Sequence, residues 1–450
     1  MRLALRLFRP VPVLRLAGAL PVLAALAGCV GLREADGTEA VIRAKAAGLP
    51  VLSAPAGGSA KDAAAGGLLQ SPALREAASL VAASADDVRV QRAALFPSLG
   101  LTLGGGIGDA GKGNPALELE GRQLVLDFGD TKRAVTAADI DLQINYLSFQ
   151  KTVDETLVAA LSAYDTTRMY RELRAVRREQ LAAMRKLETL IAARTETGAA
   201  TSPDLLETRK RIQAAEFLVH DTQLAEAEAQ DRLLRLTGLT TGGTVPVPEG
   251  SCQTPGGTDD MRMAQLRLAK AQLKLERAER SRLPRLSLNP VVRSGLGEGR
   301  ATVGLNMGVQ SDILEGGALT ARANAARNSH LGAQAGVDAA QLDGDLEARG
   351  LQRSLSAGRQ KMAMLERQIA LVTQTRALYR SQYFELGTRQ LSELLDNEEE
   401  FYNRQAELVE LRAAIVRTRL ECAARSRSLR SALGVDGRSV YGFPLAADEM

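Results

Sequence analysis

The sequence consists of two related halves, and this repeat limits the folds that the chain can adopt. Pro97 in LFPSLGLTL and Pro284 in RLPRLSLNP lie 187 residues apart. Gly129 in LVLDFGD and Gly316 in SDILEGG are separated by the same interval. An identical offset at two separate pairs of positions indicates a tandem structural repeat.

Each half has the same order of predicted elements. A helical stretch ends at the proline, because the residue before a proline disfavours the α region. Two short segments with alternating apolar residues follow, and glycine-rich turns join them, which predicts β-hairpins at about 98–127 and 285–312. Strands of about ten residues suit a tilted crossing of a bilayer, although alternation alone also allows the strands of a soluble sheet.

Long helices are predicted after each hairpin. The chain has no proline from Gly129 to Gly198 or from Gly316 to Gly387, and each stretch would span roughly 100 Å as a continuous helix. Apolar residues in the second stretch recur at intervals of three, four and seven, as in a coiled coil. These residues are Leu351, Leu355, Met362, Leu365, Ile369, Val372, Tyr379 and Leu386. Because the apolar stripe resumes beyond Gly387, we predict that the chain turns back there. Aligning Gly198 with Gly387 predicts the same turn in the first half.

Composition agrees with packed helices more than with an ordinary globular core. Aromatic residues make up 3% of the chain and tryptophan is absent. The formal net charge is +4 with both signs interspersed, which does not indicate binding to nucleic acid.

Two segments in which apolar residues do not recur at a regular spacing divide the chain. The segment 29–70 is rich in Ala, Gly and Ser, and we interpret it as a linker or an extended segment. A second linker is predicted at 240–258. The predicted domains are therefore repeat 1 at 71–239, repeat 2 at 259–435 and a C-terminal tail at 436–450.

The N-terminus has the pattern of a secretory signal. Arg2, Arg6 and Arg9 precede a short apolar run that ends in Leu-Ala-Gly and Cys29. This ending resembles a bacterial lipobox, so residues 1–28 are predicted to be a signal peptide and Cys29 the lipidated N-terminus of the mature chain. In that resemblance, Val30 at the next position points to the outer membrane. The alternative is an ordinary signal peptide that contains a cysteine by chance.

The remaining residues give no indication of catalysis. Cys252 lies in a Pro/Gly-rich loop, and Cys422 lies on an apolar stripe as expected for a small core residue. A disulfide between them is possible but disfavoured, and whether they are free stays open. His220 and His330 are far in sequence from each other and from any cysteine. We therefore predict a protein that is not an enzyme and that holds no metal and no cofactor apart from a lipid anchor.

The order of these features resembles the TolC-type outer membrane factor family over about residues 71–435. The resemblance rests on the lipobox, on FPSL and LPRLSL at the start of the hairpins, on DFGD and LEGG at their ends, and on LGTRQLSELLD at the second tip. It implies a mainly α fold with a small β part. Three protomers would each give four strands to one twelve-stranded barrel, which an α-helical periplasmic tunnel continues.

The resemblance also implies a function and its partners. The chain would be the outer-membrane channel of a tripartite efflux or type I secretion system. It would work as a homotrimer with a periplasmic adaptor and an inner-membrane pump of the RND or ABC type. The alternative class is a lipid-anchored periplasmic coiled-coil protein, structural or an adaptor, without a pore. The sequence does not identify the transported substrate.

The resemblance assigns gating roles to the hairpin tips. Arg389 matches the gating arginine and Asp204 matches its acidic partner in the first repeat. Glu393 and Asp396 match the acidic positions at the narrowest point of the channel. The simpler interpretation is a solvated helix face, and this is how we interpret the run Glu398–Glu400.

The same resemblance assigns docking of the adaptor to the turns, at Gly198, Gly387 and Thr388. The tyrosine that forms part of the family's gate would lie three residues before the second glycine. Phe384 occupies that position here and Tyr383 precedes it, so the tyrosine part of the gate is not carried over.

Overall fold

The computed structural model describes residues 37–104, 107–108, 111–112, 116–248, 252–253, 257–295, 301–312 and 315–446. Long helices make up most of these residues and strands a small part, as predicted. Among the described residues, one compact unit comprises 37–41, 86–139 and 276–323, and a second comprises 42–85, 140–275 and 324–446. We call them the sheet unit and the helical unit.

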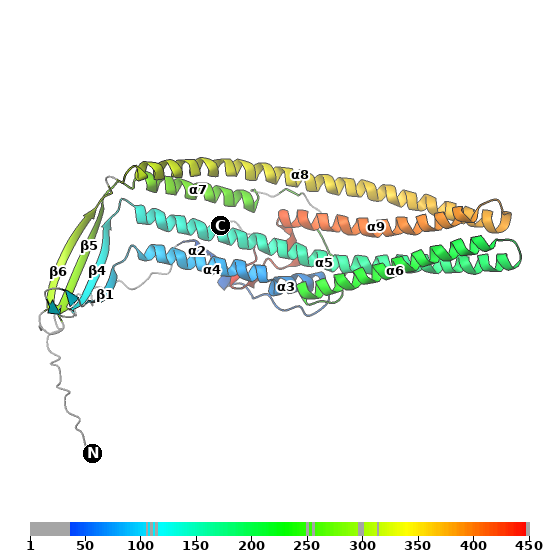
Figure 1. The fold of residues 1–450 in the computed structure, drawn as a ribbon, viewed down its shortest axis with the longest axis horizontal. Coiled ribbons are helices and arrows are strands. Elements are labelled where there is room, and N and C mark those ends of the chain that lie inside the picture. The colour runs from blue at the N-terminus through cyan, green and yellow to red at the C-terminus, as the bar shows by residue number, and fades with distance from the viewer. Residues whose placement is uncertain are drawn as a thin grey trace, which may run out of the picture. The chain divides into compact units, whose positions relative to one another are not determined.

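The order of a helix, a β-hairpin and two long helices occurs in both halves (Figure 1). The first half contains α2 (Thr38–Ala47), α3 (Ala60–Gln70), α4 (Pro72–Ala93), β1 (Ser98–Gly104), β2 (Ile107–Gly108), β3 (Gly111–Lys112), β4 (Ala116–Leu126), α5 (Asp130–Glu196) and α6 (Ser202–Thr237). The second half contains α7 (Asp259–Glu279), β5 (Arg285–Gly295), β6 (Ala301–Gln310), α8 (Ala318–Ser381), the π-helical turn η1 (Gln382–Leu386), α9 (Leu391–Arg425), α10 (Ser428–Leu433), β7 (Ser439–Val440) and β8 (Phe443–Pro444).

Four antiparallel strands form the sheet of the sheet unit, in the order β1-β4-β5-β6. They lie within the two predicted hairpin segments, and β4 and β5 join the hairpins edge to edge. The strands β1 and β6 each have one neighbour among the described strands, so each leaves an edge that can pair further.

The register of this sheet places apolar residues on one face across all four strands. Leu101 pairs with Leu119, which pairs with Val292, which in turn pairs with Val303. Further members of this apolar face are Leu99, Leu103, Leu117, Leu288, Leu305 and Met307. Leu101 is 67% exposed and Val303 is 79% exposed in the single chain.

The opposite face of the sheet is mostly polar, with Leu124 and Val291 as apolar exceptions. Thr102 pairs with Glu118, which pairs with Arg293, which pairs with Thr302. The Arg293 guanidinium forms an ion pair with Glu118 at 2.9 Å. Since side chains alternate between the faces of a strand, the period-two pattern in the sequence separates an apolar wall from a polar wall.

Two antiparallel helical hairpins dominate the helical unit, and their turns lie where the sequence predicts them. Gly198 and Gly387 have positive φ angles of 75° and 66°, which glycine adopts without steric cost. Leu355, Leu365 and Val372 of the predicted coiled-coil stripe are buried. Leu386, at the end of that stripe, is 67% exposed because the π-helical turn shifts the helix phase before Gly387.

The interval 29–70 differs from the prediction of a linker or extended segment, because its described residues contain α2 and α3. Helix α3 lies in a tightly packed site. A Cβ on Gly66 would lie 2.0 Å from the Thr237 carbonyl oxygen, and a Cβ on Gly67 would lie 2.6 Å from the Ala160 Cβ. A helix of small residues that is buried on most sides has no amphipathic period, so periodicity does not reveal it.

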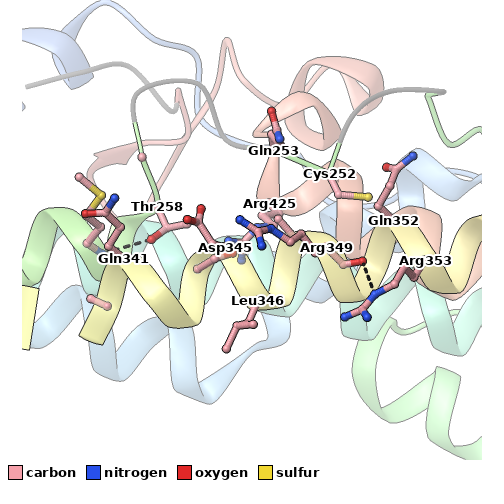
Figure 2. Close-up of a pocket in the computed structure, with 15 residues that line it drawn as sticks. Cys252, Gln253, Thr258, Gln341, Asp345, Leu346, Arg349, Gln352, Arg353 and Arg425 are labelled. Atoms are coloured by element: carbon pink, nitrogen blue, oxygen red, sulfur yellow. Dashed lines mark hydrogen bonds between the residues drawn. The ribbon is translucent and has the colours of Figure 1, made fainter. Parts of the chain in front are cut away.

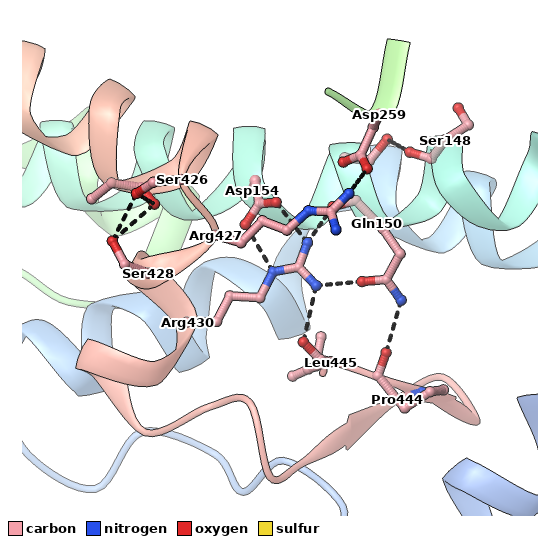
Figure 3. Close-up of polar contacts among 12 residues, drawn as sticks. Ser148, Gln150, Asp154, Asp259, Ser426, Arg427, Ser428, Arg430, Pro444 and Leu445 are labelled. Atoms are coloured by element: carbon pink, nitrogen blue, oxygen red, sulfur yellow. Dashed lines mark hydrogen bonds and ion pairs between the residues drawn. The ribbon is translucent and has the colours of Figure 1, made fainter. Parts of the chain in front are cut away.

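The predicted C-terminal tail is also ordered where the structure describes it. Strands β7 and β8 pair with each other, and Ser439 forms a bridge to Val51. The buried Arg430 of α10 holds this segment against α5 (Figure 3). Its guanidinium donates to both carboxylate oxygens of Asp154, at 2.8 and 2.7 Å, and to the carbonyl oxygen of Leu445 at 2.9 Å.

Cys252 and Cys422 form a disulfide, contrary to the expectation that this pairing is disfavoured. Both residues are buried in one apolar cluster with Leu355 and Ile415, so the core position predicted for Cys422 is correct. The linker at Cys252 and helix α8 also line a cavity of about 990 Å³ (Figure 2).

Candidate functional site: the tips of the helical hairpins

The turns of the two helical hairpins meet at a shared apolar cluster. Side chains from α5 and α6 pack there with side chains from η1 and α9. The buried members are Met184, Leu187, Ile191, Ile212, Tyr383, Leu391, Leu394 and Leu395. A polar cleft of about 410 Å³ lies beside it, and its lining includes Asp204, Glu207 and Arg389.

Arg389 is held within the second hairpin. Its Nε donates to the Gln382 side-chain oxygen at 3.1 Å, and its Nη1 donates to the Glu393 carboxylate at 3.1 Å. The guanidinium carbon lies 4.0 Å from the ring centroid of Tyr379, within the range of a cation–π interaction. The predicted gating arginine is therefore half-buried and fixed in orientation.

Asp204 caps the start of α6. Its carboxylate accepts hydrogen bonds from the Thr201 backbone N–H at 2.9 Å and from the Thr201 hydroxyl at 2.8 Å. The Asp204 N–H donates back to the Thr201 hydroxyl, which completes a capping box. The structure brings Asp204 and Arg389 to one cleft, and the described chain forms no ion pair between them.

Arg211 of α6 connects the two hairpins. Its guanidinium contacts Glu207 on its own helix at 2.9 Å, and Asp396 and Glu399 on α9 at 2.9 and 2.6 Å. Asp396, predicted at the channel's narrowest point, is thus paired within the chain. The interpretation of Glu399 as ordinary surface is wrong, since this side chain is part of the contact between hairpins.

Glu398 is also not a surface residue, because its side chain is completely buried. It accepts hydrogen bonds from Arg376 and Arg380 of α8, each at 2.7 Å. The Arg376 guanidinium also lies over the rings of Phe401 and Tyr402. A buried carboxylate is tolerated when it is paired in this way, so the acidic run of α9 ties α9 to α8 on one side.

Tyr383 fills part of the apolar cluster, next to the position at which the family's gate carries a tyrosine. Burial raises the pKa of its phenol, the charge of Asp204 adds to this rise, and the charge of Arg194 opposes it. Arg194 at the end of α5 donates to the Phe384 carbonyl oxygen at 3.1 Å and lies over the Tyr383 ring. This contact is a second link between the hairpins.

The residues predicted to dock an adaptor lie at the surface. Gly198, Gly387 and Thr388 are exposed, and a Cβ on either glycine would meet nothing within 4 Å. The Thr388 N–H donates to the Gln382 carbonyl oxygen at 3.0 Å, which closes the turn. Docking at these positions stays a prediction.

Sequence reasoning missed Arg211, Arg194 and the buried role of Glu398. The spacing of Glu207 and Arg211 on one helix face predicts their own contact. The partners on α9 are more than 180 residues away in sequence. Only the three-dimensional packing of the hairpins brings them together.

The described residues contain no group of three or more His, Cys, Asp or Glu side chains arranged to hold a metal ion. In the same residues, no helix has both the length and the apolar character needed to cross a membrane. Cys29, the predicted lipidation site, lies outside the described residues.

Part of the chain matches the model of a known protein family. Residues 67–239 match the model of the family described as outer membrane efflux protein. No curated protein matches the chain in sequence.

Solved structures match most of the chain at low sequence identity. A membrane protein from Pseudomonas aeruginosa is 16% identical with a TM-score of 0.72, and the match covers 87% of this chain and 93% of that one. The outer membrane protein VceC of Vibrio cholerae is 17% identical with a TM-score of 0.72, over 83% of this chain and 95% of its own. The open state of the MtrE outer membrane channel of Neisseria gonorrhoeae is 17% identical with a TM-score of 0.66, over 83% and 88%.

These matches confirm the resemblance that the sequence predicts. The solved structures, which include the MtrE outer membrane channel, share the fold described above. Residues 67–239 are thus similar to the outer membrane efflux protein family, and over most of its length the chain shares the fold of these solved outer-membrane proteins.

Proposed function

We propose that the chain is the outer-membrane channel of a tripartite efflux or type I secretion system. Three copies form a passive conduit from the periplasm to the exterior, and a gate at the hairpin tips controls it. A periplasmic adaptor docks at Gly198, Gly387 and Thr388, and an inner-membrane pump of the RND or ABC type supplies the energy. A lipid on Cys29 anchors each copy in the outer membrane.

The two-faced sheet is the observation that carries this proposal. Its apolar face is exposed in the single chain, while its other face is mostly polar. The outer strands β1 and β6 have free edges within the described chain, and an open edge is not tolerated in lipid. Joining β1 of one copy to β6 of the next removes every edge, and three copies give a barrel of twelve strands.

Exposed apolar stripes on the helices of the helical unit also support self-association. Exposed apolar residues follow one stripe of α8, with Met364, Leu371 and Leu378 at intervals of seven residues. On α6, Leu206, Phe217 and Leu224 form a second exposed stripe. Such stripes at heptad-like spacing are typical of a coiled-coil seam that needs a partner helix. A second copy of the chain offers this partner.

The gate assignment rests on the position of four residues. Arg389 and Asp204 line one cleft, and Glu393 and Asp396 lie in the first two turns of α9. In a trimer, the three copies of this acidic set surround one axis, where like charges at a narrow point favour cations.

The experiment is a conductance measurement on the purified protein in planar bilayers. The wild-type protein is expected to run as a trimer and to show small conductance, and Arg389→Ser combined with Asp204→Ala is expected to raise it. Because Asp204 also caps α6, Thr201→Ala is the control that removes the capping hydroxyl and keeps the carboxylate. A monomer without conductance would favour the alternative of a periplasmic coiled-coil protein and reject the channel.

A further inference from the structure

We infer that Arg211 is a positioning residue of the gate, since it holds the tip of α9 against α6 within each copy of the chain. The inference rests on the proposed channel function for its role in gating. We call the contacts of Arg211 with Asp396 and Glu399 the Arg211 clasp.

The geometry of the clasp suits a contact that can open. The Arg211 side chain is 25% exposed, and its two partners on α9 are 61% and 26% exposed. Partly exposed ion pairs are weak and are screened by salt. Both partners also come from the other hairpin, so separating the hairpins breaks both pairs together.

The contact on the opposite side of α9 is different. Glu398 is completely buried and paired with Arg376 and Arg380 of α8, and the Asn397 side chain donates to the Thr375 hydroxyl at 3.0 Å. Breaking a buried pair leaves an uncompensated charge, which is strongly unfavourable. A buried carboxylate therefore holds α8 and α9 together, whereas the ion pairs between α6 and α9 are partly exposed and lie beside the shared apolar cluster.

Asp396 gains a second role in this arrangement. A carboxylate paired with Arg211 is turned toward α6, and losing the pair frees it. Separation of the hairpins thus changes both the width of the tip and the charge that faces the axis. Arg389, held by Glu393 and Tyr379 inside the second hairpin, moves with α9 as part of one body.

The test compares Arg211→Gln with a matched control, Arg209→Gln. Arg209 lies on the same helix, and its ion pair with Glu188 at 2.9 Å stays within the first hairpin. Hydrogen–deuterium exchange of residues 391–400 measures how firmly the tip of α9 is held. Single-channel recording of the same trimers measures the frequency of opening.

We expect Arg211→Gln to raise both the exchange of 391–400 and the opening frequency, by about fivefold, the effect of losing two partly exposed pairs. Arg209→Gln is expected to leave both unchanged. Arg211→Lys, whose single ammonium cannot bridge two carboxylates as the planar guanidinium does, should lie between wild type and Arg211→Gln. About 1 M salt should bring the wild-type protein close to Arg211→Gln.

Two results overturn the clasp. In the first, Arg211→Gln has the same hydrogen–deuterium exchange of 391–400 and the same opening frequency as the wild type, while the double variant Arg389→Ser, Asp204→Ala conducts. This result would leave the proposed function intact. The other is an equal increase in Arg209→Gln, which would indicate general loosening of the tip. If exchange rises only in Arg211→Gln but no variant conducts, the clasp stands and the channel function fails.

Discussion

Cys252 and Cys422 are joined by a disulfide that links the segment between the two repeats to the long helix α9. The two cysteines are 170 residues apart in the sequence, and the loop between them includes β5, β6 and α8. Disulfides persist in oxidising compartments such as the bacterial periplasm. The bond therefore agrees with the secretory signal predicted from the N-terminus.

Reducing this disulfide is expected to destabilise the fold. Closing a long loop restricts the unfolded chain, and removing a native disulfide typically costs about 2–5 kcal/mol. Cys422→Ser and Cys252→Ser should lower the urea midpoint equally, and dithiothreitol should bring the wild-type protein to the same midpoint. Midpoints that do not respond to dithiothreitol would show that the two thiols are not paired.

Glu398→Gln is expected to destabilise the second helical hairpin by about 3–5 kcal/mol, because Arg376 and Arg380 lose the one buried carboxylate they share. Thermal unfolding followed by circular dichroism measures this loss. Glu400→Gln is the control, since that side chain is half-exposed and a change there should stay within about 0.5 kcal/mol. Equal effects of the two substitutions would contradict the buried position of Glu398.

Gly66→Ala is expected to destabilise α3 by roughly 1–3 kcal/mol or more, as overpacking of a filled site does. The added Cβ would lie 2.0 Å from the Thr237 carbonyl oxygen, so the backbone has to move. Gly350→Ala in α8 is the opposite case, because its Cβ meets nothing within 4 Å. That substitution should stabilise the chain by about 0.5–1 kcal/mol, since alanine favours a helix more than glycine. Urea unfolding of both variants checks the sign of each change.

Acid is expected to weaken the contacts of Arg211. The hydrogen bond from Arg211 is the main cause that lowers the pKa of Glu207. A carboxyl whose pKa is lower in the folded state stabilises the fold above its unfolded pKa, about 4.3 for Glu, and this contribution is lost as the pH falls through the folded pKa. The stability difference between wild type and Glu207→Gln should be constant near neutral pH and vanish in acid. A difference that grows as the pH falls would contradict this assignment.

The sequence was sufficient to predict the strands and helices in which apolar residues recur at a regular spacing. Alternation in the two hairpin segments predicts the strands, and the heptad stripe through Leu355, Leu365 and Val372 predicts the buried face of α8. The turns at Gly198 and Gly387 follow from the glycines that interrupt long helical patterns. In each case a local pattern carries the information.

The parts that the sequence did not reveal depend on contacts between distant residues. Helix α3 has no amphipathic period because it is buried on most sides, and only its packing against Thr237 and Ala160 explains its glycines. The acidic run of α9 shows no local sign that Glu398 points inward while Glu399 reaches Arg211. The same holds for Cys252, whose partner is fixed by the fold and not by spacing.

The central claim is that the sheet separates lipid from water, and labels on its two faces test it most directly. Single cysteines in place of Leu305 on the apolar face and Asn306 on the polar face of β6 would carry a fluorophore, with the Cys252–Cys422 disulfide left intact. In vesicles, a lipid-resident quencher should quench the label at position 305, and an aqueous quencher should quench the label at position 306. Equal access of the aqueous quencher to both positions would contradict the account, because the sheet would then lie in water and not form the wall of a channel.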